Sequence, residues 1–197
     1  APADLVLFDL DRPWIGDVTT GTTILLYDGC GDGPTVLATF AFTAPTGDAD
    51  FFVSGAAPNS RLGEGFWAVS SQILVTQTLD PCVLFYGFGY RHRFDDSFRA
   101  GPGLAGRIRV NPGEQFIYQL GLGFAANESV TFSTSFGGAY VTEDQINGRR
   151  VFGGITEPMR LRFAATIAKP CKIVEPFAEI GMTRDAANSR FGITWTY

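Results

Sequence analysis

The chain has 197 residues, enough for one domain, and only 18% of them are charged, below the roughly 25% of soluble domains. Aromatic residues reach 14%, and the sequence is too apolar for a disordered chain. The net charge of −5 argues against nucleic acid as a partner, because phosphates need a basic surface.

The apolar stretches are too short for a membrane-spanning helix. Runs such as 24–27 and 83–86 fall far below the roughly 18 residues that a helix needs to cross a bilayer. One histidine, His92, and three cysteines at unrelated spacings form no metal-binding pattern. We therefore expect no metal, no cofactor and no enzymatic activity.

In chain order, large apolar residues alternate with small or polar ones at the period of a β-strand. A weak candidate strand lies at 4–10, and a better one follows at 16–27. The further strands are expected at 36–43, 67–76, 83–91, 115–124, 129–140, 159–168, 174–183 and 190–197. Each is about as long as the ~9–11 residues that cross a bilayer at a tilt.

The connections between these strands alternate in length. The short ones are 28–33, 78–81, 125–128 and 169–171, and the long ones are 45–65, 94–114 and 141–156. The last connection, 184–189, is short but falls on the long side. Outer-membrane barrels have short periplasmic turns and longer outer loops, so the chain end at Tyr197 is expected on the periplasmic side. Asn147-Gly148 is a favoured hairpin turn, which predicts two strands that rise past the membrane and turn there.

A secreted β-sandwich would show the same alternation, but two features favour a transmembrane barrel. The polar face is mostly Gly, Ser, Thr and Ala, and the chain has lysine only at Lys169 and Lys172. Aromatic residues gather near strand ends, as expected for the membrane interface. These aromatics are Trp67, Tyr90, Tyr118, Tyr140, Trp195 and Tyr197. The sequence therefore predicts an all-β, antiparallel, up-and-down transmembrane barrel in contact with the lipid of the bacterial outer membrane.

The last strand carries a more specific pattern. Phe191, Ile193, Trp195 and Tyr197 alternate with small or polar residues and end the chain on an aromatic ring. This resembles the terminal signal that outer-membrane proteins present to the barrel assembly machinery, which we therefore expect as a partner during biogenesis.

Several stretches of turn and strand residues resemble a known family. They are Gly16-Asp17-Val18, 44–48, 65–70, Asn111-Pro112-Gly113-Glu114, 120–124 and 176–186. On them the chain is similar to the outer-membrane family named for the phenol-degradation meta-pathway, whose members are transporter-like. Members of that family usually have further strands before the Gly-Asp-Val stretch. Residues 1–15 are therefore either the first strand of a barrel of about ten strands or an outer loop of one with 12–14, and residues 16–197 form the barrel.

If the large apolar residues face lipid, the other face of each strand lines the lumen. The expected lumen residues are Arg91, Arg93, Gln119, Arg160, Arg162, Glu175, Phe177, Glu179 and Arg190. Pairing the strands around the 169–172 turn places Arg162 opposite Glu179, where opposite charges stabilise a sheet modestly. These side chains either fill the lumen as an ionic network or line a narrow polar path, and apolar neighbours such as Phe85 would suit a hydrophobic or aromatic solute.

The sequence leaves two functions open. The favoured one is a passive channel for small, hydrophobic or aromatic solutes, in line with the resemblance. The alternative is a structural or interaction barrel, filled by side chains, that contacts other envelope proteins. Cys30 and Cys82 fall at neighbouring periplasmic turns, and they form either a disulfide or two free thiols.

Overall fold

The structure is a computed structural model, and it describes residues 16–29, 33–47, 63–99, 106–151, 154–170, 172–186 and 188–196. The candidate strand at 4–10, Cys30 and Tyr197 lie outside these ranges. All regular secondary structure in the described residues is β-strand. No helix among them is long and apolar enough to cross a membrane.

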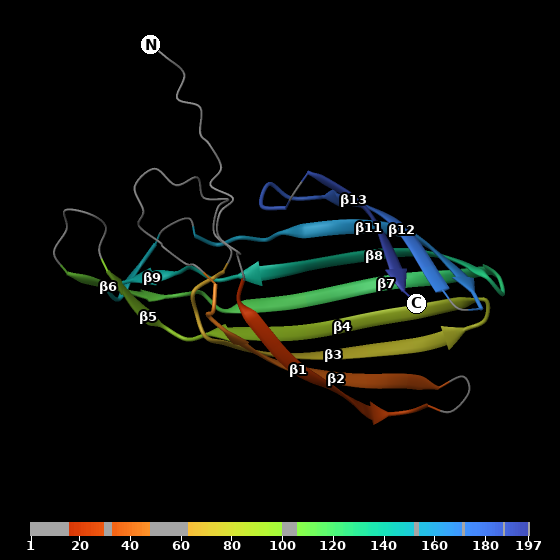
Figure 1. Ribbon diagram of the computed structural model, residues 1–197, viewed down its shortest axis with the longest axis horizontal. Coiled ribbons are helices and arrows are strands. Elements are labelled where there is room, and N and C mark those ends of the chain that lie inside the picture. The colour runs from red at the N-terminus through yellow and green to blue at the C-terminus, as the bar shows by residue number, and fades with distance from the viewer. Residues whose placement is uncertain are drawn as a thin grey trace, which may run out of the picture.

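Within the described ranges, nine strands form one antiparallel sheet in which spatial neighbours follow each other along the chain (Figure 1). They are β1 (Val18–Tyr27), β2 (Pro34–Ala44), β3 (Ala68–Leu79), β4 (Cys82–Arg93), β7 (Gln115–Asn127), β8 (Val130–Val141), β11 (Met159–Lys169), β12 (Lys172–Gly181) and β13 (Ser189–Thr196). The nine strands expected between residues 16 and 197, and their up-and-down order, are confirmed.

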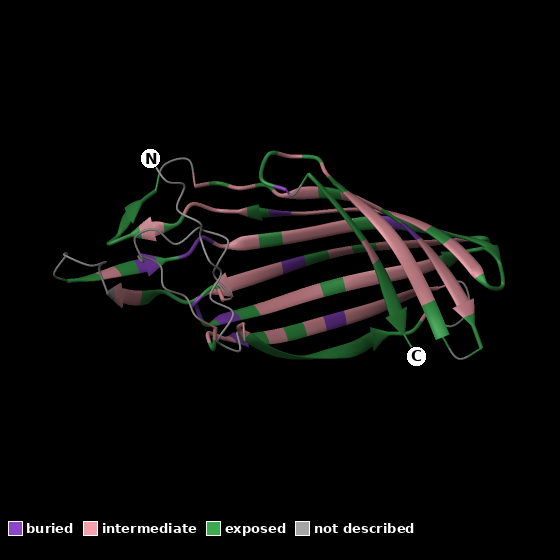
Figure 2. Ribbon diagram, turned by 45° about the horizontal axis from the view of Figure 1, so that its top comes forward, coloured by how far each residue is buried: buried purple, intermediate pink, exposed green. Residues whose placement is uncertain are grey.

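The sheet curls strongly, so that β12 and β13 pass in front of its middle strands in the views of Figures 1 and 2. The short connections join strands at one end of the sheet, at the right of Figure 1, and the long ones leave from the other end. β1 and β13 are the edge strands, and no pairing joins them within the described part of the chain.

A second, four-stranded sheet is built from the long connections. It consists of β5 (Asp96–Arg99), β6 (Arg107–Asn111), β9 (Gln145–Ile146) and β10 (Arg149–Arg150), and we call it the outer sheet. Asn147 and Gly148 have φ values of 51° and 78°, the left-handed pair that a tight β9–β10 hairpin requires, so the expected turn is confirmed. The sequence did not predict β5 and β6, because strands this short have no readable period.

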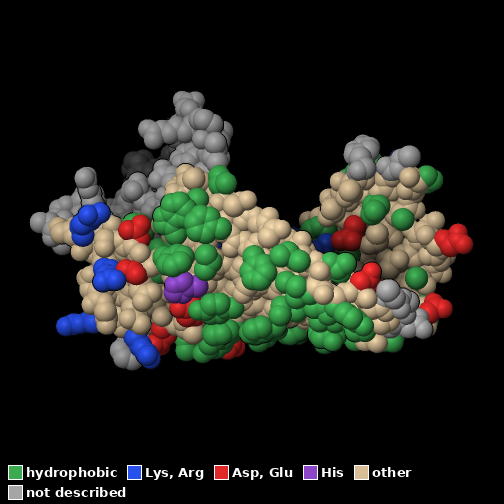
Figure 3. Space-filling view, turned by 90° about the horizontal axis from the view of Figure 1, so that it is seen from below, with side chains coloured by type: hydrophobic (Ala, Val, Ile, Leu, Met, Phe, Trp, Pro, Cys, Tyr) green, Lys and Arg blue, Asp and Glu red, His purple; other side chains and the backbone are tan. Residues whose placement is uncertain are grey.

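Burial in the nine-stranded sheet is the reverse of that in a soluble protein. The buried positions of the sheet are small, such as Ala38, Ala68 and Ala139. Large apolar side chains are exposed instead, and Phe88 and Phe191 leave 58% and 77% of their surface open. Figure 2 shows few buried positions, and Figure 3 shows apolar side chains spread along the outer wall. An apolar outer wall of this size is suited to lipid and not to water.

Candidate lumen site

The strand register places all nine expected lumen residues on one face, opposite to the large apolar side chains. Gln119 pairs with Gly87 and Gly137, and Gly137 pairs with Arg160, so these positions share that face. Arg162 pairs with Glu179, which in turn pairs with Arg190, so the register expected from the 169–172 turn is confirmed.

An ionic network occupies this face on β11, β12 and β13. The shortest ion pair joins Arg162 to Glu175 at 2.7 Å, although Glu175 lies four residues along β12 from the register partner Glu179. The register partner Glu179 lies 3.9 Å from Arg162 and 3.7 Å from Arg190. The Thr166 hydroxyl donates a hydrogen bond of 2.8 Å to Glu175. Two cations and two anions therefore balance one another along three strands.

Inward-pointing rings lie against glycines of the adjacent strand. The ring of Phe177 covers Gly192, and the ring of Phe85 covers Gly121, where an added Cβ would collide with each ring. The Arg162 guanidinium lies 4.3 Å from the centre of the Phe177 ring, a cation–π contact. The glycines thus make room for aromatic side chains on the inner face without pushing neighbouring strands apart.

Beside the network lies a cavity of about 310 Å³. Polar side chains of Gln119, Ser135 and Arg160 contribute to its wall. Within the described part of the chain, Arg160 has no carboxylate partner, unlike Arg162 and Arg190. The wall of the cavity is therefore partly polar and partly apolar, and Arg160, without a carboxylate partner among the described residues, faces it.

At the outer end of the same face, Glu64 holds two arginines. Its carboxylate lies 2.9 Å from Arg91 and 3.9 Å from Arg93. The backbone N–H of Glu64 donates to the Asp17 carboxylate, which also accepts a hydrogen bond from Gly47. The sequence did not predict this role of Glu64, because the residue lies in a long connection and not on a strand.

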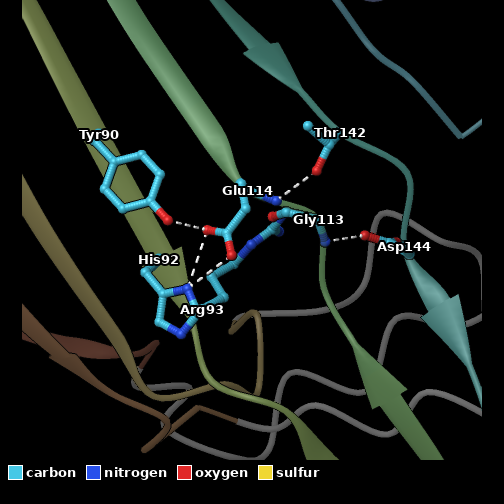
Figure 4. A network of polar contacts seen from close by, with 7 residues as sticks. All are labelled: Tyr90, His92, Arg93, Gly113, Glu114, Thr142 and Asp144. Atoms are coloured by element: carbon cyan, nitrogen blue, oxygen red, sulfur yellow. Dashed lines mark hydrogen bonds and ion pairs between the residues drawn. The ribbon is translucent and has the colours of Figure 1, made fainter. Parts of the chain in front are cut away.

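A second polar cluster lies at the outer rim, on the outward face (Figure 4). The Glu114 carboxylate accepts hydrogen bonds from the Tyr90 hydroxyl at 2.6 Å and from His92 Nδ1 at 2.9 Å. Burial raises the pKa of Glu114, but these hydrogen bonds and the charges of His92 and Arg93 outweigh burial, so the pKa lies below its ordinary value. The sequence did not predict that His92 and Glu114 are partners.

The backbone of Gly113 and Glu114 is hydrogen-bonded to the connection that follows β8. The Thr142 hydroxyl accepts the backbone N–H of Glu114 at 2.8 Å, and Asp144 accepts that of Gly113 at 2.7 Å (Figure 4). Arg93 donates to the carbonyl of Gly113 at 2.8 Å. The Asn111-Pro112-Gly113-Glu114 stretch is therefore a structural junction between the barrel wall and the outer sheet.

The described aromatics expected at the membrane interface share the outward face. Tyr90 pairs with Phe116, which pairs with Tyr140, and the Trp67 ring lies 5.2 Å from Phe42. Tyr118 and Trp195 have the same orientation by register. Cys82 carries a free thiol, and Cys30, for which a disulfide to Cys82 or a free thiol was left open, lies outside the described residues.

Comparison with known proteins shows similarity to a protein family and to a solved structure. A family model described as "Putative MetA-pathway of phenol degradation" matches residues 9–166. A crystal structure of an outer membrane channel from Pseudomonas putida F1 superposes with a TM-score of 0.72 at 17% sequence identity. That match covers 93% of this chain and 64% of the channel, so the chain spans less than two thirds of the channel's length.

The structural match supports the architecture that the strands show. The fold is that of an antiparallel outer-membrane β-barrel wall, with the apolar residues and the ionic network on opposite faces of the sheet. Barrels with an apolar outer band lie in the bacterial outer membrane, and the protein is an outer-membrane protein.

Proposed function

Because the chain belongs to the family described as the putative MetA-pathway of phenol degradation, we propose that it is a passive channel for small aromatic or hydrophobic solutes. The observation that carries this proposal is the cavity of about 310 Å³ on the inner face, beside Arg160. The similarity to an outer membrane channel supports the same role. The nine expected lumen residues on the inner face, from Arg91 on β4 to Arg190 on β13, would line the path.

The chemistry of the inner face supports an aromatic solute. The side chains of Phe85 and Phe177 lie on the same face as the polar residues, and Leu74 and Ile117 share that face. An aromatic solute with a polar group could contact rings and polar side chains along one wall. Faster flux of benzoate than of gluconate into proteoliposomes would support this solute class, because both are monoanions and only one is aromatic.

A second function is favoured by the network of Arg162, Glu175, Glu179 and Arg190. A barrel of about ten strands is mostly filled by its own side chains, and an ionic network of this kind would then act as a plug. In that case the protein would be a structural barrel whose outer loops or wall contact other envelope proteins.

Single-channel conductance of the refolded protein in a planar bilayer separates the two functions. Ser135 lines the cavity, and its neighbour Thr134 faces outward. We expect Ser135→Trp to reduce the conductance steps strongly and Thr134→Trp to leave them unchanged. A silent bilayer, with folding confirmed by heat-modifiable gel mobility, would contradict the channel and support the filled barrel.

We propose transport without a chemical reaction. Glu175 is bound to Arg162 and Thr166, and Glu179 lies between two arginines, so neither is arranged as a free acid or base. Among the described residues, no group of three or more metal-ligating side chains comes together.

We also propose that the last strand directs assembly. Phe191, Ile193 and Trp195 on the edge strand β13 expose 77%, 70% and 53% of their surface on the outward side. A recognition surface for the barrel assembly machinery would have this exposed apolar edge, and lipid would cover the same residues after insertion.

A further inference from the structure

The outer sheet has two chemically different faces. One face is apolar, because Phe98 pairs with Ile108, and Val110 pairs with Ile146. The Phe98 ring meets the buried Phe66 edge-on at 5.3 Å and Val110 is buried, so this face packs against the protein there, whereas its end at Ile146 and Arg149 is exposed. The opposite face is therefore the one that the protein leaves open.

The open face carries arginine and amide side chains, and we call it the arginine face. Arg109 and Asn111 are two residues apart on β6, so their side chains lie on the same side of the sheet. Asn111 pairs with Gln145, and Gln145 pairs with Arg150, so these residues share that side. Arg107 lies on the same side as Arg109. These three arginines are exposed, in a chain whose overall charge is −5.

The carboxylates near this face leave the cations available. Arg109 is paired with Asp95 at 2.7 Å, but its side chain is still 67% exposed. Arg107 makes one long hydrogen bond, of 3.5 Å, to the carbonyl of Ser97. Arg150 has no ion pair within the described residues, although Glu143 lines the same hollow. Guanidinium groups in this state can bind phosphate oxygens with two parallel hydrogen bonds.

Two adjoining hollows mark where a ligand would lie. One, of about 530 Å³, is lined by Arg109, Asn111, Gln145, Asn147 and Gly148. The other, of about 460 Å³, contains Gln145 and Arg150. Amide side chains between arginines are suited to a ligand that carries both phosphate and hydroxyl groups, such as a phosphorylated sugar.

The second hollow also connects the arginine face to the lipid-facing wall. Its lining includes Tyr140, which lies on the outward face and pairs there with Phe116. Figure 3 shows basic side chains gathered at one end of the molecule, beyond the apolar wall. Because long loops lie outside the cell in outer-membrane barrels, this is the level of the head groups of the outer leaflet.

We propose that the arginine face binds the phosphorylated head-group and core sugars of lipopolysaccharide in the outer leaflet. Arg107, Arg109 and Arg150 bind phosphate groups, and Asn111 and Gln145 bind sugar hydroxyls. The contact holds the outer sheet against the membrane surface beside the barrel. This inference depends on the outer-membrane location and not on the proposed channel activity.

The test uses the full chain refolded in detergent micelles, with folding confirmed by heat-modifiable mobility. The probes are fluorescent lipopolysaccharide with a phosphorylated core and the same material dephosphorylated with hydrofluoric acid. We expect dephosphorylation, or the triple change Arg107→Gln, Arg109→Gln and Arg150→Gln, to weaken binding about tenfold or more.

Arg149 provides a matched control within the same hairpin. It is exposed and carries the same charge as Arg150, but it pairs with Ile146 and lies on the other side of the strand. We expect Arg150→Gln to weaken binding several-fold and Arg149→Gln to leave it unchanged. Equal losses for the two variants, or equal binding of the dephosphorylated probe, would overturn the proposal. Unchanged single-channel conductance in the triple variant would show that the channel is intact.

Discussion

At the scale of single residues, Glu114 joins parts of the chain that are distant in sequence. Its carboxylate binds Tyr90 and His92 of β4, while its backbone N–H binds Thr142 beyond β8. The carboxylate is half-buried and accepts two hydrogen bonds, so its charged form is favoured in the folded protein. Protonating this one group should therefore loosen the junction between the barrel wall and the outer sheet.

The acid stability of the protein should depend on Glu114. Its pKa in the folded state lies below the unfolded value of about 4.3, so its stabilising contribution is complete above that pH. The contribution is lost as the pH falls through the lower, folded-state pKa. We expect Glu114→Gln to be less stable than the wild type at pH 7, and its unfolding free energy to change less on acidification. Urea unfolding in lipid vesicles at neutral and acidic pH measures both.

Glu128 offers a control for the many other carboxylates. It is exposed in the short turn between β7 and β8, away from the rim cluster. Glu128→Gln should keep the acid dependence of the wild type. If Glu114→Gln showed the same acid dependence as Glu128→Gln, the rim cluster would not contribute to acid sensitivity.

The charged residues show how far the sequence predicts single contacts. The alternation of apolar and polar residues along the strands and the position of the 169–172 turn were enough to place Arg162 opposite Glu179. They did not reveal that Glu175 lies closer to Arg162, at 2.7 Å, because Glu175 is four residues from the register partner and the contact depends on side-chain direction and length as well as register. The contacts of Glu64 and Glu114 come from long connections, for which a strand period gives no information.

At the scale of elements, each strand alternates large outward side chains with inward residues, and some inward positions are glycines that make space for an aromatic ring. Gly121 illustrates this, because the Phe85 ring of β4 occupies the space where its side chain would be. Gly123 lies two residues along the same face, and the atom nearest to the place a Cβ would take there is 3.7 Å away. A methyl group therefore fits at Gly123 but not at Gly121.

These two glycines make a matched pair of substitutions on β7. We expect Gly121→Ala to destabilise the protein by about 1–3 kcal/mol, because the added methyl group overpacks the site against Phe85. Gly123→Ala should be close to neutral. Urea unfolding in lipid vesicles measures the difference, and adding Phe85→Ala to Gly121→Ala should remove the overpacking. Equal effects at both glycines would show that the ring does not limit the site.

The nine long strands could be predicted because each has enough residues to show its period, and Asn147-Gly148 revealed its hairpin by turn chemistry alone. Of the outer sheet, only the β9–β10 hairpin could be predicted. The outer sheet pairs Asn111 with Gln145, two residues separated by two whole strands of the barrel wall. Nothing local in the sequence indicates that such distant short segments meet.

At the scale of the whole molecule, the wall is one sheet thick and separates two environments. Neighbouring residues of one strand therefore meet different surroundings. Leu120, near the middle of β7, is 52% exposed on the apolar outer face, whereas Gln119 lines the inner cavity.

Adding a positive charge at these two neighbours tests the orientation of the wall. We expect Leu120→Lys to cost about 2–4 kcal/mol of folding free energy in lipid, because it places a charge in the bilayer. Gln119→Lys should cost much less, because the inner face is polar. Folding titrations in urea with lipid vesicles measure both. A larger cost at Gln119 than at Leu120 would mean that the faces are assigned the wrong way round.

The alternation of the strands also has an evolutionary consequence. Insertion into lipid constrains one set of positions, and the inner face uses the other set, so the two are subject to nearly separate selection. Residues such as Ser135 and Arg160 can change while Thr134 and Leu161 stay as they are. A lineage could therefore alter what enters the barrel without first losing its ability to reach the membrane.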